Sequence, residues 1–204
     1  YSDEDLAFLL QYETNGFNQW QATQTLLERI LLNGHSSDIY VEAMKNALPE
    51  VMKKDPLLAS RLFDVPTEGY LGSRIDANYN PVEIQAKRNA LLDTLANAFG
   101  AFSKEAYLTL DPANEKEFSQ AMGVRALKNI LLAMIARQGD ESAFELADAQ
   151  YKSTKNMSER LGALRVLVWN DAPQAEAALI DYYLRFKDEA LSMDQWFMVQ
   201  AAHP

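Results

Sequence analysis

Hydrophobic residues recur along this chain at the three- and four-residue spacing of amphipathic helices. Leu92, Leu95, Ala96 and Phe99 form one such stripe. Two more stripes have the same spacing: Leu127, Ile130, Leu131 and Met134, then Leu179, Tyr182, Tyr183 and Phe186. Because residues three and four apart share one face of a helix, each set predicts a helix that buries one apolar side.

Helix starts are predicted where a polar side chain can accept hydrogen bonds from the first free backbone N–H groups. Proline at the first helical position, or an acid or amide three residues on, strengthens the signal. Seven places fit: Ser2 with Asp5, Asp55 with Pro56, Asn80 with Pro81 and Glu83, Asp111 with Pro112, Asn156 with Glu159, Asp171 with Gln174, and Ser192 with Gln195. They bound segments of helical length, so an all-α fold is predicted.

Three similar segments begin at Arg88, Arg125 and Arg160, which are 37 and 35 residues apart. Each starts with a basic residue and continues as an apolar helix face. A unit of about 36 residues is the length of a helix pair in an α-solenoid, in which each pair buries its apolar face against the next. We therefore expect a HEAT- or armadillo-like superhelix of antiparallel helix pairs, with a compact bundle as the alternative.

Residues 1–204 are expected to form a single helical domain. Its least regular stretch is a connection around residues 64–80, which holds Pro66, Gly69, Gly72 and the run Asn78-Tyr79-Asn80. We interpret it as a short helix between two loops that changes the direction of the array. A ligand-contacting loop is the alternative.

Composition restricts the classes of partner. The formal net charge of −10 repels polyphosphate, and no segment concentrates Lys and Arg among aromatic residues, which argues against a nucleic-acid partner. No apolar run approaches the roughly 18 residues of a transmembrane helix. The chain has no cysteine, which fits a reducing cytoplasm, and we expect a cytoplasmic location.

Candidate catalytic and metal-binding residues are scarce. His35 lies in a helix-ending turn and His203 near the last residue, and neither has a second histidine at the spacing that binds zinc. The acidic runs Asp3-Glu4-Asp5, Glu115-Lys116-Glu117 and Asp140-Glu141 fall near predicted helix starts, where negative charge is favourable. Trp20, Trp169 and Trp196 lie on apolar stripes and are interpreted as packing residues. No catalytic, cofactor-binding or metal-binding residue is assigned.

Six segments in order resemble a known family. They are Phe17-Asn-Gln-Trp-Gln-Ala-Thr-Gln-Thr-Leu-Leu27, Asp55-Pro-Leu-Leu-Ala59 with Val65-Pro-Thr-Glu68, Asn80-Pro-Val-Glu-Ile84, Arg125-Ala-Leu-Lys-Asn129, Asn156-Met-Ser-Glu-Arg-Leu-Gly-Ala-Leu164 and Asp194-Gln-Trp-Phe-Met-Val-Gln-Ala201. Together they resemble the C-terminal helical domain of bacterial aminopeptidase N, the zinc-dependent alanyl aminopeptidase of the M1 metallopeptidase family. The resemblance covers the whole chain.

This resemblance implies a place in a multidomain exopeptidase that removes single N-terminal residues from peptides, with a zinc-bound water attacking the carbonyl. In that family the helical superhelix covers the catalytic domain, encloses the active-site chamber and limits entry to short or unfolded peptides. The implied partners are the catalytic domain of the same polypeptide and peptide substrates. The family's His-Glu-x-x-His motif and Gly-Ala-Met-Glu-Asn motif do not occur in residues 1–204, so zinc is expected only in the parent's catalytic domain and the isolated segment should be inactive.

Tyr1 is not an initiator Met, and the chain stops just after Trp196–Gln200 begin a new helix, which indicates an excised piece. An exposed apolar patch is then expected near Trp196–Val199, where missing helices would pack. A free-standing solenoid that serves as a protein-interaction scaffold is the second hypothesis, because the repeat spacing fits it equally well. An enzyme complete within these residues is the third.

Overall fold

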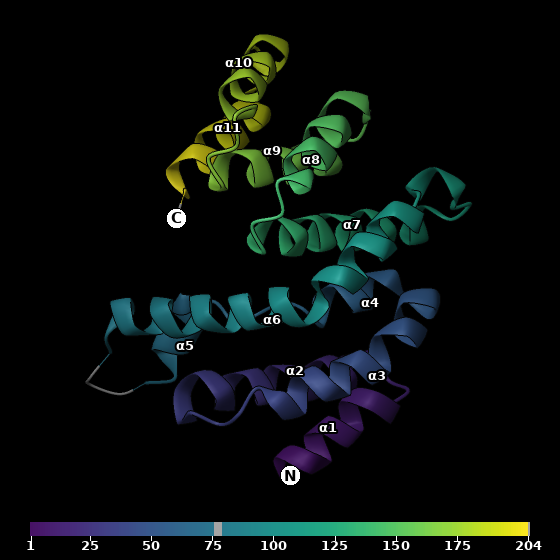
Figure 1. Ribbon diagram of the computed structural model, residues 1–204, viewed down its shortest axis with the longest axis vertical. Coiled ribbons are helices and arrows are strands. Elements are labelled where there is room, and N and C mark those ends of the chain that lie inside the picture. The colour runs from purple at the N-terminus through teal and green to yellow at the C-terminus, as the bar shows by residue number, and fades with distance from the viewer. Residues whose placement is uncertain (76–78, 204) are drawn as a thin grey trace. The chain divides into compact units, whose positions relative to one another are not determined.

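The structure is a computed structural model that describes residues 1–75 and 79–203 (Figure 1). The described residues are helices, turns and connections, with no strand among them, so the all-α prediction is confirmed. The α-helices are α1 (Asp3–Tyr12), α2 (Gly16–Glu28), α3 (Asp38–Lys54), α4 (Pro56–Arg61), α5 (Glu68–Ser73), α6 (Pro81–Thr109), α7 (Phe118–Arg137), α8 (Ser142–Ser153), α9 (Met157–Trp169), α10 (Ala175–Phe186) and α11 (Ala190–Ala201). A π-helical turn, η1 (Arg29–Asn33), follows α2, and a 3-10 turn, η2 (Pro112–Asn114), precedes α7.

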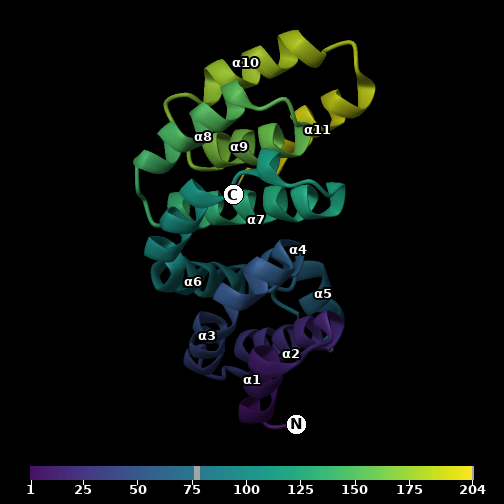
Figure 2. The ribbon, with the colours of Figure 1, turned by 90° about the vertical axis from the view of Figure 1, so that its right-hand side faces the viewer.

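The chain divides into two compact units, which are described separately. Unit 1 comprises Tyr1–Ala98 and Ala113–Leu127, and unit 2 comprises Phe99–Pro112 and the described residues from Lys128 onward. The long helices α6 and α7 each contribute residues to both units. Figure 2 shows the course of the same helices from a second side.

Four of the seven predicted helix starts are confirmed. Ser2 and Asp5 form a reciprocal capping box at α1, Asp55 caps α4, Asn80 accepts from the first N–H groups of α6, and Asn156 caps α9. Each polar side chain accepts from a backbone N–H that has no partner within its own helix.

The other three predicted starts are wrong. Asp111 precedes only the 3-10 turn η2, and α7 begins later, at Phe118. Asp171 adopts a left-handed conformation with φ of 49°, which belongs to a turn, and α10 begins at Ala175. Ser192 lies inside α11, where its hydroxyl donates to the Glu189 carboxylate at 3.2 Å instead of capping the helix.

The predicted repeat does not mark equivalent helix pairs. Arg88, Arg125 and Arg160 lie in α6, α7 and α9. Between the first two, within the described residues 79–203, the chain completes α6 and passes only the 3-10 turn before α7, whereas α8 intervenes before α9. The similar spacings of 37 and 35 residues therefore arise differently, the first from the long helix α6 and the second from a pair of helices, α7 and α8.

Two of the three predicted apolar stripes are largely buried. Leu95, Ala96 and Phe99 of α6 are buried, as are Leu127, Leu131 and Met134 of α7, whereas Leu92 and Ile130 are half-buried. The α10 stripe is only partly right, because Tyr182 is fully buried but Tyr183 is 43% exposed. Tyr183 instead contacts the Trp196 ring of α11, with 5.6 Å between ring centroids.

In unit 1 the irregular connection is held in place by side chains from neighbouring helices. α5 is the short helix expected there; part of the second loop, including Asn78, lies outside the described residues. Arg88 of α6 donates to the Pro66 carbonyl at 2.7 Å and to the Glu68 carboxylate at 3.3 Å. Glu28 of α2 accepts from Tyr70 and Arg74, so α5 is fixed to α2 as well.

In unit 2 four helices meet at a polar network around Gln150 of α8. Tyr107 of α6 donates to the Gln150 amide oxygen at 2.9 Å, and the Gln150 amide nitrogen donates to Asn129 of α7 at 2.9 Å and to the Glu159 carbonyl of α9 at 2.8 Å. Gly162 of α9 packs so closely on Asn129 that an added Cβ would lie 2.3 Å from the amide carbon. The segments around Asn129 and Gly162, which carry part of the resemblance, therefore serve to join helices.

Acid should weaken unit 2 through Asp140. Lys104 donates to the Asp140 carboxylate at 2.9 Å, and the hydroxyl and the backbone N–H of Ser142 also donate to it. Together these hydrogen bonds, that from Lys104 first, lower the pKa of Asp140 from 3.8 to about 2. Because the folded pKa lies below the unfolded one, the ionised carboxylate stabilises the fold above about pH 4, and this contribution is lost as the pH falls toward about 2. Asp140→Asn should therefore show a smaller loss of melting temperature over that range than the wild type. Asp148→Asn, which removes only an i,i+4 pair on α8, is the matched control, and equal acid sensitivity of all three chains would contradict the assignment.

Candidate functional site

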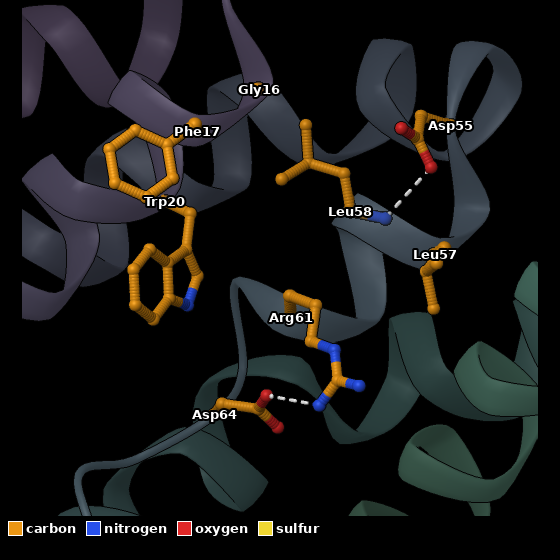
Figure 3. A pocket seen from close by; sticks show the side chains of 8 residues that line it. All are labelled: Gly16, Phe17, Trp20, Asp55, Leu57, Leu58, Arg61 and Asp64. Atoms are coloured by element: carbon orange, nitrogen blue, oxygen red, sulfur yellow. Dashed lines mark hydrogen bonds and ion pairs between the residues drawn. The ribbon is translucent and has the colours of Figure 1, made fainter.

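Unit 1 has a groove between the start of α2 and α4, shown in Figure 3. It has a volume of about 480 Å³. Its lining comprises Gly16, Phe17, Trp20, Asp55, Leu57, Leu58, Arg61 and Asp64. We call it the Trp20 groove.

One wall of the Trp20 groove is aromatic. Asn15 caps α2 by accepting from the N–H groups of Phe17 and Asn18, so the helix begins just before the two aromatic residues. Phe17 and Trp20 are three residues apart and share one face of α2, with 5.8 Å between ring centroids. At Gly16 an added Cβ would lie 3.0 Å from the Leu58 side chain, so a larger residue there would press on α4.

The opposite wall is aliphatic with a charged rim. Asp55 caps α4 by accepting from the Leu58 N–H at 2.9 Å, which fixes Leu57 and Leu58 against the groove. Arg61 and Asp64 form an ion pair at 3.0 Å at the end of α4. Figure 3 shows Leu58 extending toward α2, with Leu57 farther from the two rings and the Arg61–Asp64 ion pair on another side of the groove.

A second hollow of about 690 Å³ adjoins the first, and the two share Trp20 and Asp64. Its other lining residues include Gln24, Phe63 and Pro66. Gln24 donates to the Asp64 carbonyl at 2.8 Å, which holds the backbone between the two hollows. Trp20 therefore stands where two depressions of unit 1 meet.

The chemistry of the Trp20 groove is that of recognition. Its aromatic and aliphatic walls can cover an apolar side chain, and two carboxylates against one guanidinium leave it negative by one charge. In the part of the chain that the structure describes, the Trp20 indole N–H donates to no protein acceptor and is available to a ligand. No nucleophile or histidine base lines the groove.

The two histidines contact different aspartates. His35 follows the turn after η1, as predicted, and its Nδ1 is 2.6 Å from the Asp3 carboxylate. His203 Nε2 is 3.1 Å from Asp171. Among residues 1–75 and 79–203 no group of three or more His, Asp and Glu side chains could hold a metal ion.

Two of the acidic runs lie at helix starts, and one of them also makes a longer-range contact. Asp5 belongs to the α1 capping box and Asp140 accepts from the Ser142 N–H at the start of α8, as predicted. Asp3 lies in the first turn of α1, as predicted, and it also accepts from Arg29 Nη1 at 2.6 Å and contacts His35, so it joins α1 to the residues around η1. The hydrogen bond from Arg29, followed by that from His35, holds the pKa of Asp3 below its usual value.

Two of the three tryptophans confirm the packing interpretation. Trp169 donates to the Val199 carbonyl at 2.8 Å and Trp196 to the Leu179 carbonyl at 2.9 Å, so both join neighbouring helices of unit 2. Trp20 instead lines the Trp20 groove.

Sequence reasoning missed this groove because its walls come from segments near residues 17 and 55, and only the fold brings them together. Both segments are among those that carry the family resemblance, which was the available signal.

In the described ranges, no helix is long and apolar enough to span a membrane.

A comparison with known protein families assigns this chain to one of them. A family described as "Domain of unknown function (DUF3458_C) ARM repeats" matches residues 3–204. The chain belongs to this family. Its ARM-repeat description, together with the helices seen here, confirms the predicted solenoid-like, all-α fold.

Two relatives of this DUF3458_C domain are named aminopeptidase N. The chain is 28% identical to aminopeptidase N of Escherichia coli over 213 residues, and 26% identical to aminopeptidase N of Caulobacter vibrioides over 209 residues. The alignments cover 100% and 98% of this chain but 24% of each relative, so the chain spans about a quarter of their length. The resemblance to the C-terminal helical domain of aminopeptidase N is therefore confirmed.

A solved structure supports the fold of the DUF3458_C domain. The crystal structure of Legionella pneumophila aminopeptidase A in complex with aspartic acid matches with a TM-score of 0.84 and 23% identity. The match covers 98% of this chain and 25% of that one.

Proposed function

We propose that this domain is the noncatalytic C-terminal helical segment of a zinc-dependent aminopeptidase of the M1 family. The parent enzyme removes N-terminal residues from peptides, and the segment caps and encloses its active-site chamber and limits substrate access. Its partners are the catalytic domain of the same polypeptide and the parent's peptide substrates. We propose a cytoplasmic location, with which the lack of cysteine is compatible.

One observation carries the proposal. Nearly the whole chain aligns with two proteins named aminopeptidase N, and the aligned region is about a quarter of the length of each. Two features support a noncatalytic role for this segment in the parent enzyme. The Trp20 groove offers apolar recognition without a nucleophile or histidine. The segments that carry the resemblance join helices or line this groove, as expected of a structural wall.

The residues of this chain do not fit the zinc of the proposed parent. His35 contacts Asp3 in unit 1, and His203 contacts Asp171 in unit 2. Within the described residues no group of three or more His, Asp and Glu side chains could hold a metal ion. In the proposal, zinc belongs to the catalytic domain, where it would activate water for attack on the carbonyl. No step of that chemistry is assigned to residues of this chain.

The purified chain, supplied with zinc, should not hydrolyse alanine p-nitroanilide above the rate in buffer. A zinc aminopeptidase assayed in parallel controls for the substrate and metal. Hydrolysis by this chain that a chelator abolishes would contradict the noncatalytic assignment and support an enzyme complete within these residues.

Enclosure of the chamber is tested on the intact parent. Two kinds of substrate carry the same N-terminal sequence. One is a free short peptide, and in the other the same sequence is joined to a folded domain by a linker of variable length. The parent should cleave the tethered substrate slowly when the linker is short, and lengthening the linker should restore kcat/KM. Equal kcat/KM for the free peptide and the shortest linker would contradict enclosure, whatever the peptidase activity.

A further inference from the structure

Trp20 differs from the other two tryptophans because its indole N–H has no protein acceptor. Trp169 and Trp196 donate to backbone carbonyls of unit 2. Within residues 1–75 and 79–203 the N–H of Trp20 makes no such bond, and Figure 3 shows the indole nitrogen on the edge of the ring nearer Arg61. A half-buried indole usually gives this donor to a partner, so the free N–H of Trp20 is open to a bound molecule.

The apolar patch expected near Trp196–Val199 lacks such a free donor. Phe197 and Met198 are exposed there, but Val199 is fully buried, so the patch is smaller than predicted. The N–H of Trp196 is already used within unit 2. The Trp20 groove is therefore the more specific surface, since a polar group at an apolar site fixes the orientation of what binds.

The walls of the Trp20 groove are held in place by hydrogen bonds within unit 1. Asn15 and Asp55 cap the helices on its two sides, and Gln24 donates to the Asp64 carbonyl at 2.8 Å where the two hollows meet. Phe17 is nevertheless 66% exposed on this fixed backbone. A wall that is already ordered loses little conformational freedom on binding, which favours affinity. Aromatic side chains placed in this way are the usual anchors of protein recognition.

One carboxylate of the Trp20 groove has no basic partner. Arg61 is paired with Asp64 at 3.0 Å, and Arg88 of the adjoining hollow is paired with Glu68 at 3.3 Å. In the part of the chain that the structure describes, the exposed Asp55 carboxylate accepts only from a backbone N–H of α4. The whole chain has a net charge of −10. A basic group is therefore attracted to the chain and meets an uncompensated carboxylate in the groove.

The size of the site suits a short segment of polypeptide. The Trp20 groove and the adjoining hollow have volumes of about 480 and 690 Å³. Sites for small ligands occupy roughly 300 to 1,000 Å³, enough for a few side chains and their backbone but not for the face of a folded domain. Contacts of this size are weak and reversible.

We propose that the Trp20 groove binds a short segment of a separate protein, in which a leucine or phenylalanine stands next to lysine or arginine. The apolar side chain packs on Phe17, Trp20 and Leu58. The basic side chain pairs with Asp55, and a backbone carbonyl of the segment accepts from the N–H of Trp20. A separate partner fits the charge, because long-range attraction speeds the encounter of molecules that diffuse freely. Binding at this groove goes beyond the proposed function and does not depend on a peptidase parent.

Binding is measured with the peptide acetyl-Lys-Leu-Lys-amide, by NMR of the three indole N–H groups in an isotopically labelled chain. The Trp20 signal should shift and saturate as peptide is added. The signals of Trp169 and Trp196 are internal controls and should not move, because these N–H groups donate to carbonyls of unit 2. The peptides acetyl-Glu-Leu-Glu-amide and acetyl-Lys-Ser-Lys-amide should bind at least about tenfold more weakly, since each lacks one of the two features recognised.

Asp55→Asn tests the charge without removing the helix cap, because asparagine caps a helix as well as aspartate does. This variant should bind the Lys-Leu-Lys peptide about threefold to tenfold more weakly, and its binding should depend less on salt. Asp38→Asn is the matched control. It neutralises an exposed carboxylate in the first turn of α3, so it changes the net charge equally and should leave binding unchanged.

Phe17→Ser tests the apolar wall, with Phe8→Ser as its matched control. Phe17 and Phe8 are 66% and 61% exposed, and each ring contacts one aromatic ring on its own helix. Both variants should keep the melting temperature of the wild type. Only Phe17→Ser should weaken peptide binding, by at least about fivefold.

Several results would overturn the proposed binding site: a Trp20 signal that does not move at millimolar peptide, equal binding by Asp55→Asn and Asp38→Asn, or equal binding of the Lys and Glu peptides. A Trp20 signal that changes with the concentration of the chain alone would make a second copy the occupant. Peptide binding by this chain that is lost in the intact parent would make the groove a contact between domains. None of these results bears on the hydrolysis assay, which tests the proposed function separately.

Discussion

Replacing Arg160 with methionine is expected to lower the stability of unit 2 by about 3 kcal/mol, because two carbonyls lose their donor in a largely buried site. Arg160 is 7% exposed and donates to the carbonyls of Tyr151, at 2.8 Å, and Thr154. These carbonyls lie at the end of α8, where the last turn of a helix has no internal donors. The guanidinium also stands over the Tyr151 ring at 5.3 Å.

Arg160 acts in this way as a cap for the C-terminal end of α8. Its positive charge suits the negative end of the helix dipole, and in the described chain it has no carboxylate partner. Methionine keeps much of the apolar stem, so the change removes the guanidinium with its hydrogen bonds, charge and ring contact while leaving most of the apolar packing.

The stability loss is measured by urea unfolding, with hydrogen exchange to localise it to α8 and α9. Lys152→Met is the matched control, because Lys152 lies on α8 in a surface pair with Asp148 and its loss should change stability by less than about 1 kcal/mol. If Arg160→Met and Lys152→Met destabilise equally, the capping role of Arg160 is wrong.

Gly123→Ala should destabilise unit 1 by about 2 to 3 kcal/mol, because the new methyl group overpacks a rigid contact. An added Cβ at Gly123 would lie 2.7 Å from the backbone nitrogen of Leu57 and 3.1 Å from Pro56 Cγ. Backbone at the start of α4 cannot rotate away as a flexible side chain could, so α7 and α4 must move apart. Leu57 also lines the Trp20 groove, so the emission of Trp20 should shift in a chain whose other tryptophans are replaced by phenylalanine.

Gly69→Ala is the control for Gly123→Ala. It lies in α5, and an added Cβ there meets no atom within 4 Å. Alanine favours helix more than glycine does, so this change should be neutral or stabilising by up to about 1 kcal/mol. A Gly123→Ala chain as stable as the Gly69→Ala chain would show that α4 and α7 do not meet as described.

Much of the fold could be predicted because local chemistry determines it. Ser2, Asp55, Asn80 and Asn156 cap helices as expected, since a short polar side chain beside free N–H groups acts within a few residues. The failures come from tertiary structure. Asp171 has the sequence of a cap but sits in a left-handed turn.

Long-range contacts could not be predicted from the pattern. Arg160 resembles the basic start of a repeat, and only the fold shows that it fastens the end of α8. Gly123 lies within an apolar helix, and nothing local shows that α4 approaches it. The Trp20 groove likewise requires α2 and α4 to meet, so its residues could be noticed in the sequence but not joined into a site.

The most direct test of the proposed parent enzyme is the sequence of the DNA that flanks the segment encoding Tyr1–Pro204, with the open frame read in both directions. We predict an in-frame His-Glu-x-x-His motif several hundred codons upstream, which would place a zinc peptidase domain in the same polypeptide. A start codon directly before Tyr1 and a stop codon directly after Pro204 would contradict this account, and would leave a self-contained helical scaffold that acts through binding partners.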